Sequence, residues 1–176
     1  MPGAESGRYG LKRAAALVPL SRDHHFALIH ALGLRRAAGA SARDTPGVTA
    51  TASAFLAFYE EELRGHFADE EDVLLPLLTG AEAARLRTEH AGLHAQALAL
   101  SAALAEPADV RPALQSLGDA LHDHVRFEER ELFEALQTRL TPAALDALAA
   151  GLAAHREARG RGQGCLVLPP MPFFKR

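Results

Sequence analysis

The chain has 176 residues, of which 48% are apolar, and its net charge is −3. This is the composition of a globular domain with its own core, and the small charge gives no reason to expect binding to nucleic acid or to an anionic membrane surface. No apolar run approaches the ~20 residues that span a bilayer. Alanine and leucine dominate and aromatic residues make up only 6%, which favours helices over sheets.

A single cysteine, Cys165, excludes an intrachain disulfide and a metal site built from several thiolates of one chain. A bound metal would therefore be held by nitrogen and oxygen donors. Near the N-terminus the stretch "LKRAAALVPL" has basic residues before a short apolar patch, but no convincing cleavage site follows it. We therefore expect mature sequence and a cytoplasmic protein.

The first part of the chain predicts an irregular N-terminal arm over residues 1–18, followed by a helical domain over 19–159. The first helix is expected over about 21–38 with Ser21 as its N-cap, and it ends in a loop rich in Gly, Ser and Pro. A second, long helix begins near Val48 and ends near residue 78. Pro76 either bends or closes its last turn.

Three further helices complete the predicted domain. Thr79 is a candidate cap for a helix over about 81–105, and a fourth helix spans roughly 112–139. Thr141 followed by Pro142 starts a shorter fifth helix that ends near 159. The fold class is therefore all-α, an antiparallel four-helix bundle with a short fifth helix. Residues 160–176 form an irregular C-terminal tail, whose apolar end is a candidate contact for a second copy or a protein partner.

Two of the predicted helices carry a histidine and a glutamate four residues apart. These pairs are His66 with Glu70 in "HFADE" and His124 with Glu128 in "HVRFE". Each pair continues the apolar stripe of its helix, so we expect both pairs to point into the bundle. A buried carboxylate is costly unless it has a partner, and the inward stripes offer no arginine.

The other two helices add imidazoles to the same interior. The third contributes His90 and His94, four apart in "EHAGLH", and the first contributes the neighbours His24 and His25. His25 is preferred over His24 because leucines follow it three and seven residues later on one face. Five imidazoles and two carboxylates exceed the needs of one ion and fit two ions bridged by the glutamates. This donor set suits iron, manganese or zinc.

In this order the motifs resemble the hemerythrin-like (HHE cation-binding) family of non-haem di-iron four-helix bundles, over about residues 20–140. The resemblance implies two iron ions (Fe2+/Fe3+), bridged by an oxo or hydroxo group in addition to protein ligands. Those ligands would be His90, His94 and His124 for one iron, His66 and either His25 or His24 for the other, and Glu70 and Glu128 as bridges.

One departure from the family pattern concerns the acid on the fourth helix. In oxygen-carrying members it is an aspartate five residues after its histidine, whereas Glu128 stands four residues after His124. The longer carboxylate arm argues against reversible oxygen carriage but not against metal binding.

The resemblance implies a protein that binds or senses O2, a related small ligand such as nitric oxide or peroxide, or iron itself. The alternatives are a di-iron enzyme with peroxidase-like or nitric-oxide-handling activity, and a metal-free or zinc-bound helical interaction module. Because histidines must be neutral to bind a metal, we expect metal to be lost as the pH falls.

Other polar residues near the motifs are interpreted as ordinary surface. Three further histidines are expected at the surface or at a helix end: His30, His122 and His155. For His122 the alternative is a hydrogen bond near the site. The acidic and basic neighbours of the motifs are expected on the solvated face: Glu71, Asp72, Glu129 and Arg130.

Overall fold

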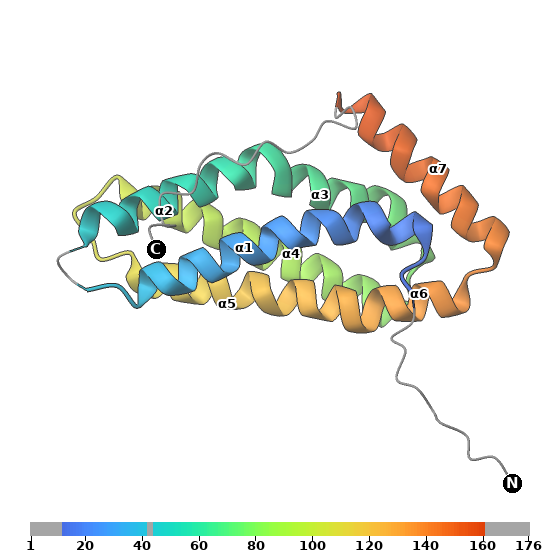
Figure 1. Cartoon of the computed structure of the whole chain (residues 1–176), viewed down its shortest axis with the longest axis horizontal. Coiled ribbons are helices and arrows are strands. Elements are labelled where there is room, and N and C mark those ends of the chain that lie inside the picture. The colour runs from blue at the N-terminus through green and yellow to red at the C-terminus, as the bar shows by residue number, and fades with distance from the viewer. Residues whose placement is uncertain (1–11, 42–43, 161–176) are drawn as a thin grey trace, which may run out of the picture.

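The computed structural model describes residues 12–41 and 44–160, and every regular element in these ranges is helical. In these ranges the helical elements form four long rods and one further helix. Figure 1 shows the rods lying side by side and the further helix crossing an end of the bundle. The predicted all-α fold is confirmed. Within the described residues no helix combines the length and apolar content that crossing a membrane requires.

The rods are built from consecutive helical segments. The first contains the 3-10 turn η1 (Ala15–Leu17) and α1 (Val18–Ala38). The second contains α2 (Thr45–Phe58), η2 (Tyr59–Leu63), α3 (Arg64–Asp69), η3 (Glu70–Leu74) and the 3-10 turn η4 (Leu75–Leu77). The third is α4 (Gly80–Leu104), and the fourth contains α5 (Arg111–Phe127), η5 (Glu128–Leu132) and α6 (Phe133–Arg139). The crossing helix is α7 (Pro142–Ala158).

Two helix starts were predicted wrongly. Each of these helices begins just before a proline, whereas the predicted start lay after it. Helix α1 begins at Val18 with a proline in its first turn, so Ser21 is inside the helix and is not its cap. Helix α2 likewise begins at Thr45, with Pro46 in its first turn, and not near Val48. Proline is well suited to a first turn, where its missing N–H leaves no hydrogen bond unmade. Leu17 is fully buried, so the end of the predicted N-terminal arm belongs to the core.

The predicted caps of the later helices are confirmed. Thr79 Oγ1 accepts a hydrogen bond from the Glu82 amide at 3.4 Å, and the Glu82 carboxylate accepts one from the Thr79 amide at 2.8 Å, which is a capping box. Thr141 Oγ1 accepts from the Ala144 amide at 3.3 Å at the start of α7. Residues 1–11 of the predicted arm and the predicted tail from residue 161, with Cys165, lie outside the described residues.

Single π-helical turns interrupt two of the rods. They are η2 and η3 in the second rod and η5 in the fourth, and the last two begin at Glu70 and Glu128. A π-turn accommodates one extra residue per turn and shifts the direction of the side chains that follow. Both glutamates of the sequence motifs therefore stand where a helix is locally widened.

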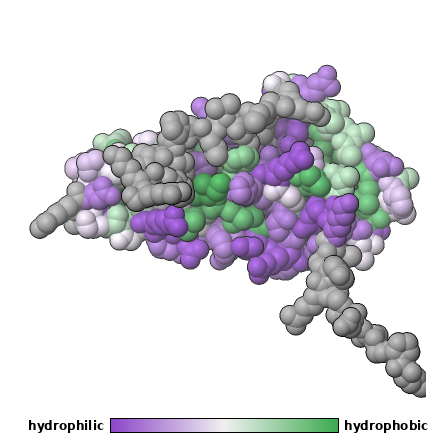
Figure 2. Space-filling view, viewed as in Figure 1, coloured by the Kyte–Doolittle hydropathy of each residue, from purple (hydrophilic) through white to green (hydrophobic). Residues whose placement is uncertain are grey.

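Two apolar clusters fill the ends of the bundle. One is centred on Leu34, Leu100 and Leu114, which have no exposure, and joins α1, α2, α4 and α5. The other contains Leu17 and Phe133 and packs α7 against the opposite end. On the face shown in Figure 2, hydrophilic side chains predominate along the flank formed by α5. The polar motifs lie in the stretch of the rods between the two clusters.

Candidate metal centre

Six polar side chains meet in the interior between the two apolar clusters. None is more than 3% exposed, and every rod supplies an imidazole. They are His24 from α1, His66 from α3, Glu70 from η3, His90 from α4, His124 from α5 and Glu128 from η5.

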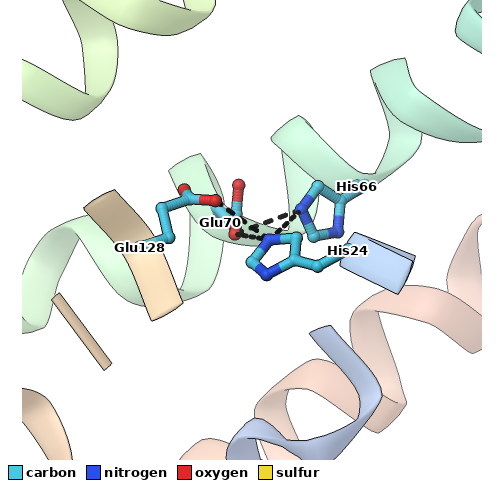
Figure 3. A group of neighbouring side chains, drawn as sticks. All are labelled: His24, His66, Glu70 and Glu128. Atoms are coloured by element: carbon cyan, nitrogen blue, oxygen red, sulfur yellow. Dashed lines mark hydrogen bonds and ion pairs between the residues drawn. The ribbon is translucent and has the colours of Figure 1, made fainter. Parts of the chain in front are cut away.

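These side chains form two overlapping groups. His24 and His66 face Glu70 and Glu128 in one group, which we call position A, and Figure 3 shows their polar ends converging. The second group, position B, combines His90 and His124 with the same two glutamates. In each group one donor atom per residue lies within 4.8 Å of the others. The two positions therefore share both carboxylates.

Glu70 divides its oxygens between the two positions. Its Oε1 lies 3.3 Å from His66 Nε2, and its Oε2 lies 3.2 Å from His90 Nε2. Glu128 Oε2 lies 2.9 Å from His24 Nε2 and 3.3 Å from His124 Nε2, so a single oxygen stands between the two positions. All four imidazoles thus direct Nε2 at the shared carboxylates.

The other ring nitrogen of each histidine, Nδ1, contacts a carboxylate on the outside of the cluster. His24 donates to Glu129 at 2.6 Å, His66 to Asp23 at 3.2 Å, His90 to Glu71 at 2.7 Å and His124 to Glu89 at 2.9 Å. We call these four acids the outer carboxylates. A hydrogen bond from Nδ1 to a carboxylate orients the ring and makes Nε2 a better metal ligand.

The outer carboxylates form a closed ring around the bundle. Each of them stands next in sequence to a cluster residue of its own rod. Each contacts the cluster histidine of the following rod, so that the contacts run from α1 to α3, from η3 to α4, from α4 to α5 and from η5 back to α1. Glu71 is exposed as predicted and Glu129 is half-buried, but the contact of each with a cluster histidine was not predicted, and Asp23 and Glu89 were not singled out. Their adjacency to the motifs was the available signal, but only the tertiary contact distinguishes them from surface acids.

Two predicted site residues do not join the cluster. His25 is exposed, whereas His24 is 2% exposed, so the preference for His25 over its neighbour was wrong. The buried face of α1 runs through His24, Ala27 and Ala31, because small residues allow the rods to approach there.

His94 is also outside both groups. It is exposed, and its Nδ1 makes a hydrogen bond with the Tyr59 hydroxyl. The inward stripe of α4 runs through His90, Leu93 and Ala97, and His94 lies to one side of this stripe. The expected division of three histidines to one ion and two to the other is therefore not what the structure shows: two imidazoles stand at each position.

The other three histidines have different surroundings. His30 is half-buried and stacks on Phe58, with ring centroids 4.1 Å apart. His122 contacts its neighbour Asp123 at 2.9 Å and is not part of the cluster. His155 contacts Asp69 and Asp72 at 2.9 and 2.8 Å, so it links α7 to the second rod and is not a free surface group.

Without a cation, the histidines and glutamates compensate one another's charge. Burial would raise the pKa of Glu70, but His66, His24 and His90 hold it well below its usual range. Burial would lower the pKa of His66, but Glu70 and Asp23 together raise it to about 9. The pKa values of His24 and His90 are likewise raised against burial by their carboxylate neighbours. The raised pKa values favour protonated imidazoles, so a cation would compete with protons for these nitrogens.

The donor atoms at the centre are poorly satisfied by the protein alone. Both carboxylate oxygens of Glu70 and of Glu128, and Nε2 of His90 and His124, are buried and contact one another as ion pairs, but none of them makes a hydrogen bond of acceptable geometry among the described residues. Buried polar atoms are nearly always paired, and leaving them unpaired costs free energy. A cation would satisfy all of them at once. The residues present therefore fit a metal centre with nitrogen and oxygen ligands.

Comparison with known proteins agrees with this geometry. Residues 17–136 match the family model of the hemerythrin HHE cation-binding domain. The chain belongs to this family. No curated protein and no solved structure is significantly similar to it. All six cluster residues lie within the hemerythrin-like region, whereas Arg13 and α7 lie outside it.

Proposed function

We propose that this hemerythrin-like protein binds two iron ions, one at position A and one at position B, and that it binds or senses a small ligand such as O2, nitric oxide or peroxide there. The single observation that carries the proposal is the pair of four-donor groups sharing two buried glutamates. Two imidazoles and two carboxylates at each position form a donor set suited to iron.

The proposed ligands are the six buried residues of the cluster. His24 and His66 would hold one ion, His90 and His124 the other, and Glu70 and Glu128 would contact both. Bound iron supplies redox change and a place for a small ligand. The four histidines would present Nε2 to the ions, while their Nδ1 hydrogen bonds to the outer carboxylates orient the rings.

The surroundings of the cluster support a dry, rigid site. Phe67 stacks on His90 with centroids 4.1 Å apart, and Phe133 stacks on His24 at 5.4 Å. Phe67 and Phe133 are both buried, and they cover the imidazole faces with apolar surface. Rigid helices and packed rings hold donors in a fixed arrangement, which favours a preorganised site.

Metal content and absorption spectra of the purified, iron-loaded protein test the proposal. We expect two irons per chain and near-ultraviolet charge-transfer absorption, with a change in the spectrum when nitric oxide is added anaerobically. Fewer than one iron per chain after loading would contradict iron binding. Retention of zinc but not iron would instead support the interaction module, and substrate-dependent turnover of peroxide would support the enzyme.

A further inference from the structure

Helix α7 lies beyond the matched region, yet buried ion pairs attach it to the second rod beside the metal centre. Asp69, which has no exposure, directly precedes Glu70. Its carboxylate contacts Arg156 Nε at 2.8 Å and His155 Nδ1 at 2.9 Å, and it also accepts a hydrogen bond from Arg159. Figure 1 shows α7 running obliquely across this end of the bundle. Its docking is therefore specific and directed at the segment that carries the cluster.

Arg156 connects this docking contact to a histidine of the cluster. While its Nε contacts Asp69, its terminal NH2 donates to Asp23 Oδ2 at 2.6 Å. The same Asp23 oxygen accepts the Nδ1 hydrogen bond of His66 at 3.2 Å. A planar guanidinium can hold two carboxylates in a fixed relative orientation. The result is a continuous chain of contacts from α7 through Asp23 to His66.

The two cation positions differ in how their outer carboxylates are held. At position A, Asp23 contacts Arg156, and Glu129 contacts Arg13 at 2.8 Å. The side chains of both arginines are only 19% exposed. At position B, Glu89 contacts Arg85, which is 45% exposed, and Glu71 is 44% exposed with no arginine contact in the described part of the chain. Among the outer carboxylates, the one that helix α7 contacts in the described part of the chain is Asp23, at position A.

We infer that Arg156 is a positioning residue for cation position A, because it holds Asp23 and thereby the His66 ring in the orientation that directs Nε2 at the shared glutamates. The inference rests on the proposed metal function. It extends the metal centre to a helix outside the hemerythrin-like region. Removing Arg156 should weaken metal binding at position A and leave position B unchanged, which a loss of overall packing would not do.

Cobalt(II) binding tests this inference in two variants that each keep one cation position intact. His124→Ala removes a ligand of position B, and His66→Ala removes one of position A. Adding Arg156→Met to the first background should weaken cobalt affinity by about tenfold or more, the usual effect of losing support behind a metal-bound histidine. Adding it to the second should change affinity by less than about twofold. Equal weakening in both backgrounds, or none in either, would overturn the inference.

Arg159→Met is the control for the docking of α7, because Arg159 pairs with Asp69 and with the Gly65 carbonyl, whereas Arg156 pairs with Asp69 and donates to Asp23. It should leave cobalt affinity at position A unchanged. If it weakens binding as much as Arg156→Met does, the effect comes from docking of α7 and the inference is wrong. Circular dichroism and thermal melting establish that each variant is folded. Should Arg156→Met fail to fold, Asp23→Asn carries the test with the same expected selectivity.

The outcomes separate this inference from the proposed function. A wild-type protein that binds no metal overturns the proposed function. A wild-type protein that binds two ions, with a folded Arg156→Met variant that does not weaken position A, overturns only the role of Arg156. If a single-position background binds no cobalt, the comparison moves to the wild-type background. There Arg156→Met must weaken one of two binding steps and leave the other unchanged.

Discussion

The interior of this bundle has two regions of equal depth and opposite chemistry. Around Leu34, Leu100 and Leu114 it is filled by aliphatic side chains without exposure, whereas the middle holds His24, Glu70 and their partners at 0–3% exposure. The first region gains free energy from removing apolar surface from water. The second loses free energy by burying charged groups and recovers part of it through mutual pairing.

The difference teaches that stability and metal binding can be separated in this protein. Apolar packing at the end of the bundle is expected to hold the rods together whether or not a metal is present. The polar middle is expected to bind a cation, and its buried charged groups are expected to lower the free energy of unfolding of the metal-free protein. Variants in the polar middle should therefore lose metal but stay folded, whereas variants in the apolar region should have a lower free energy of unfolding but keep their metal.

The largest effect is expected for Glu70→Ala. Because Glu70 contributes an oxygen to each position, the variant should lose at least one of two ions while its helical content is retained. Elemental analysis and circular dichroism on the same sample measure this. Glu61→Ala, at an exposed position of η2, is the matched control and should keep the full metal content. A Glu70→Ala protein with two ions per chain would show that the ligand assignment is wrong.

Leu114→Ala should have the opposite signature. Leu114 has no exposure, and removing most of its side chain should lower the free energy of unfolding by about 2–5 kcal/mol. Chemical denaturation measures the loss, and the folded variant should still bind two ions. Leu98→Ala, at a position that is 54% exposed, should change stability by no more than about 0.5 kcal/mol. Loss of metal from folded Leu114→Ala would mean that the two regions are coupled.

A smaller effect is expected for Gly118→Ala on α5. An added Cβ would lie 2.9 Å from the Ala31 carbonyl oxygen and 2.8 Å from Arg35 Cγ, so α1 and α5 would have to separate. Overpacking should cost about 1–3 kcal/mol, reduced by the better helix propensity of alanine. Thermal unfolding compares it with Gly92→Ala on α4, where a Cβ meets nothing within 4 Å. That variant should be stabilised by up to about 1 kcal/mol, and destabilisation by both would refute the steric explanation.

The smallest effect concerns His30, which packs beside the apolar cluster. Burial lowers its pKa from 6.5 to about 4, so the unfolded chain takes up a proton before the folded chain does. The stability contribution is therefore fully present above pH 6.5 and is lost progressively as the pH falls toward 4. His30→Gln should reduce this acid sensitivity by about 1 kcal/mol, allowing for partial exposure. Unfolding curves of both metal-free proteins at pH 7 and pH 5 provide the comparison, and identical pH dependence would contradict it.

Much of the fold could be predicted because its determinants are local. Helix periodicity, the caps at Thr79 and Thr141 and the loop-forming residues between helices act over a few positions. The pairs His66 with Glu70 and His124 with Glu128 were also expected inside, because a four-residue step keeps both members on one face. Their burial on the predicted stripes is confirmed.

The errors arose where small differences in helix rotation decide the environment of a side chain. His24 and His25 are adjacent, so only the packing of α1 against its neighbours selects which one is buried. His94 is four residues from His90 but lies at the edge of the α4 stripe, where it meets Tyr59. A helical wheel cannot resolve such rotations, and the π-turns at Glu70 and Glu128 change them further.

The sequence by itself determined that this chain forms an amphipathic helical bundle with imidazole and carboxylate donors on its inward faces, because spacing along a helix sets which side chains share a face. Tertiary structure alone decided how four imidazoles divide between two positions, and it selected the outer carboxylates that support them. It also linked Arg156 to His66, residues far apart in the chain. These contacts join different rods, and their geometry depends on how whole helices pack, which local spacing does not specify.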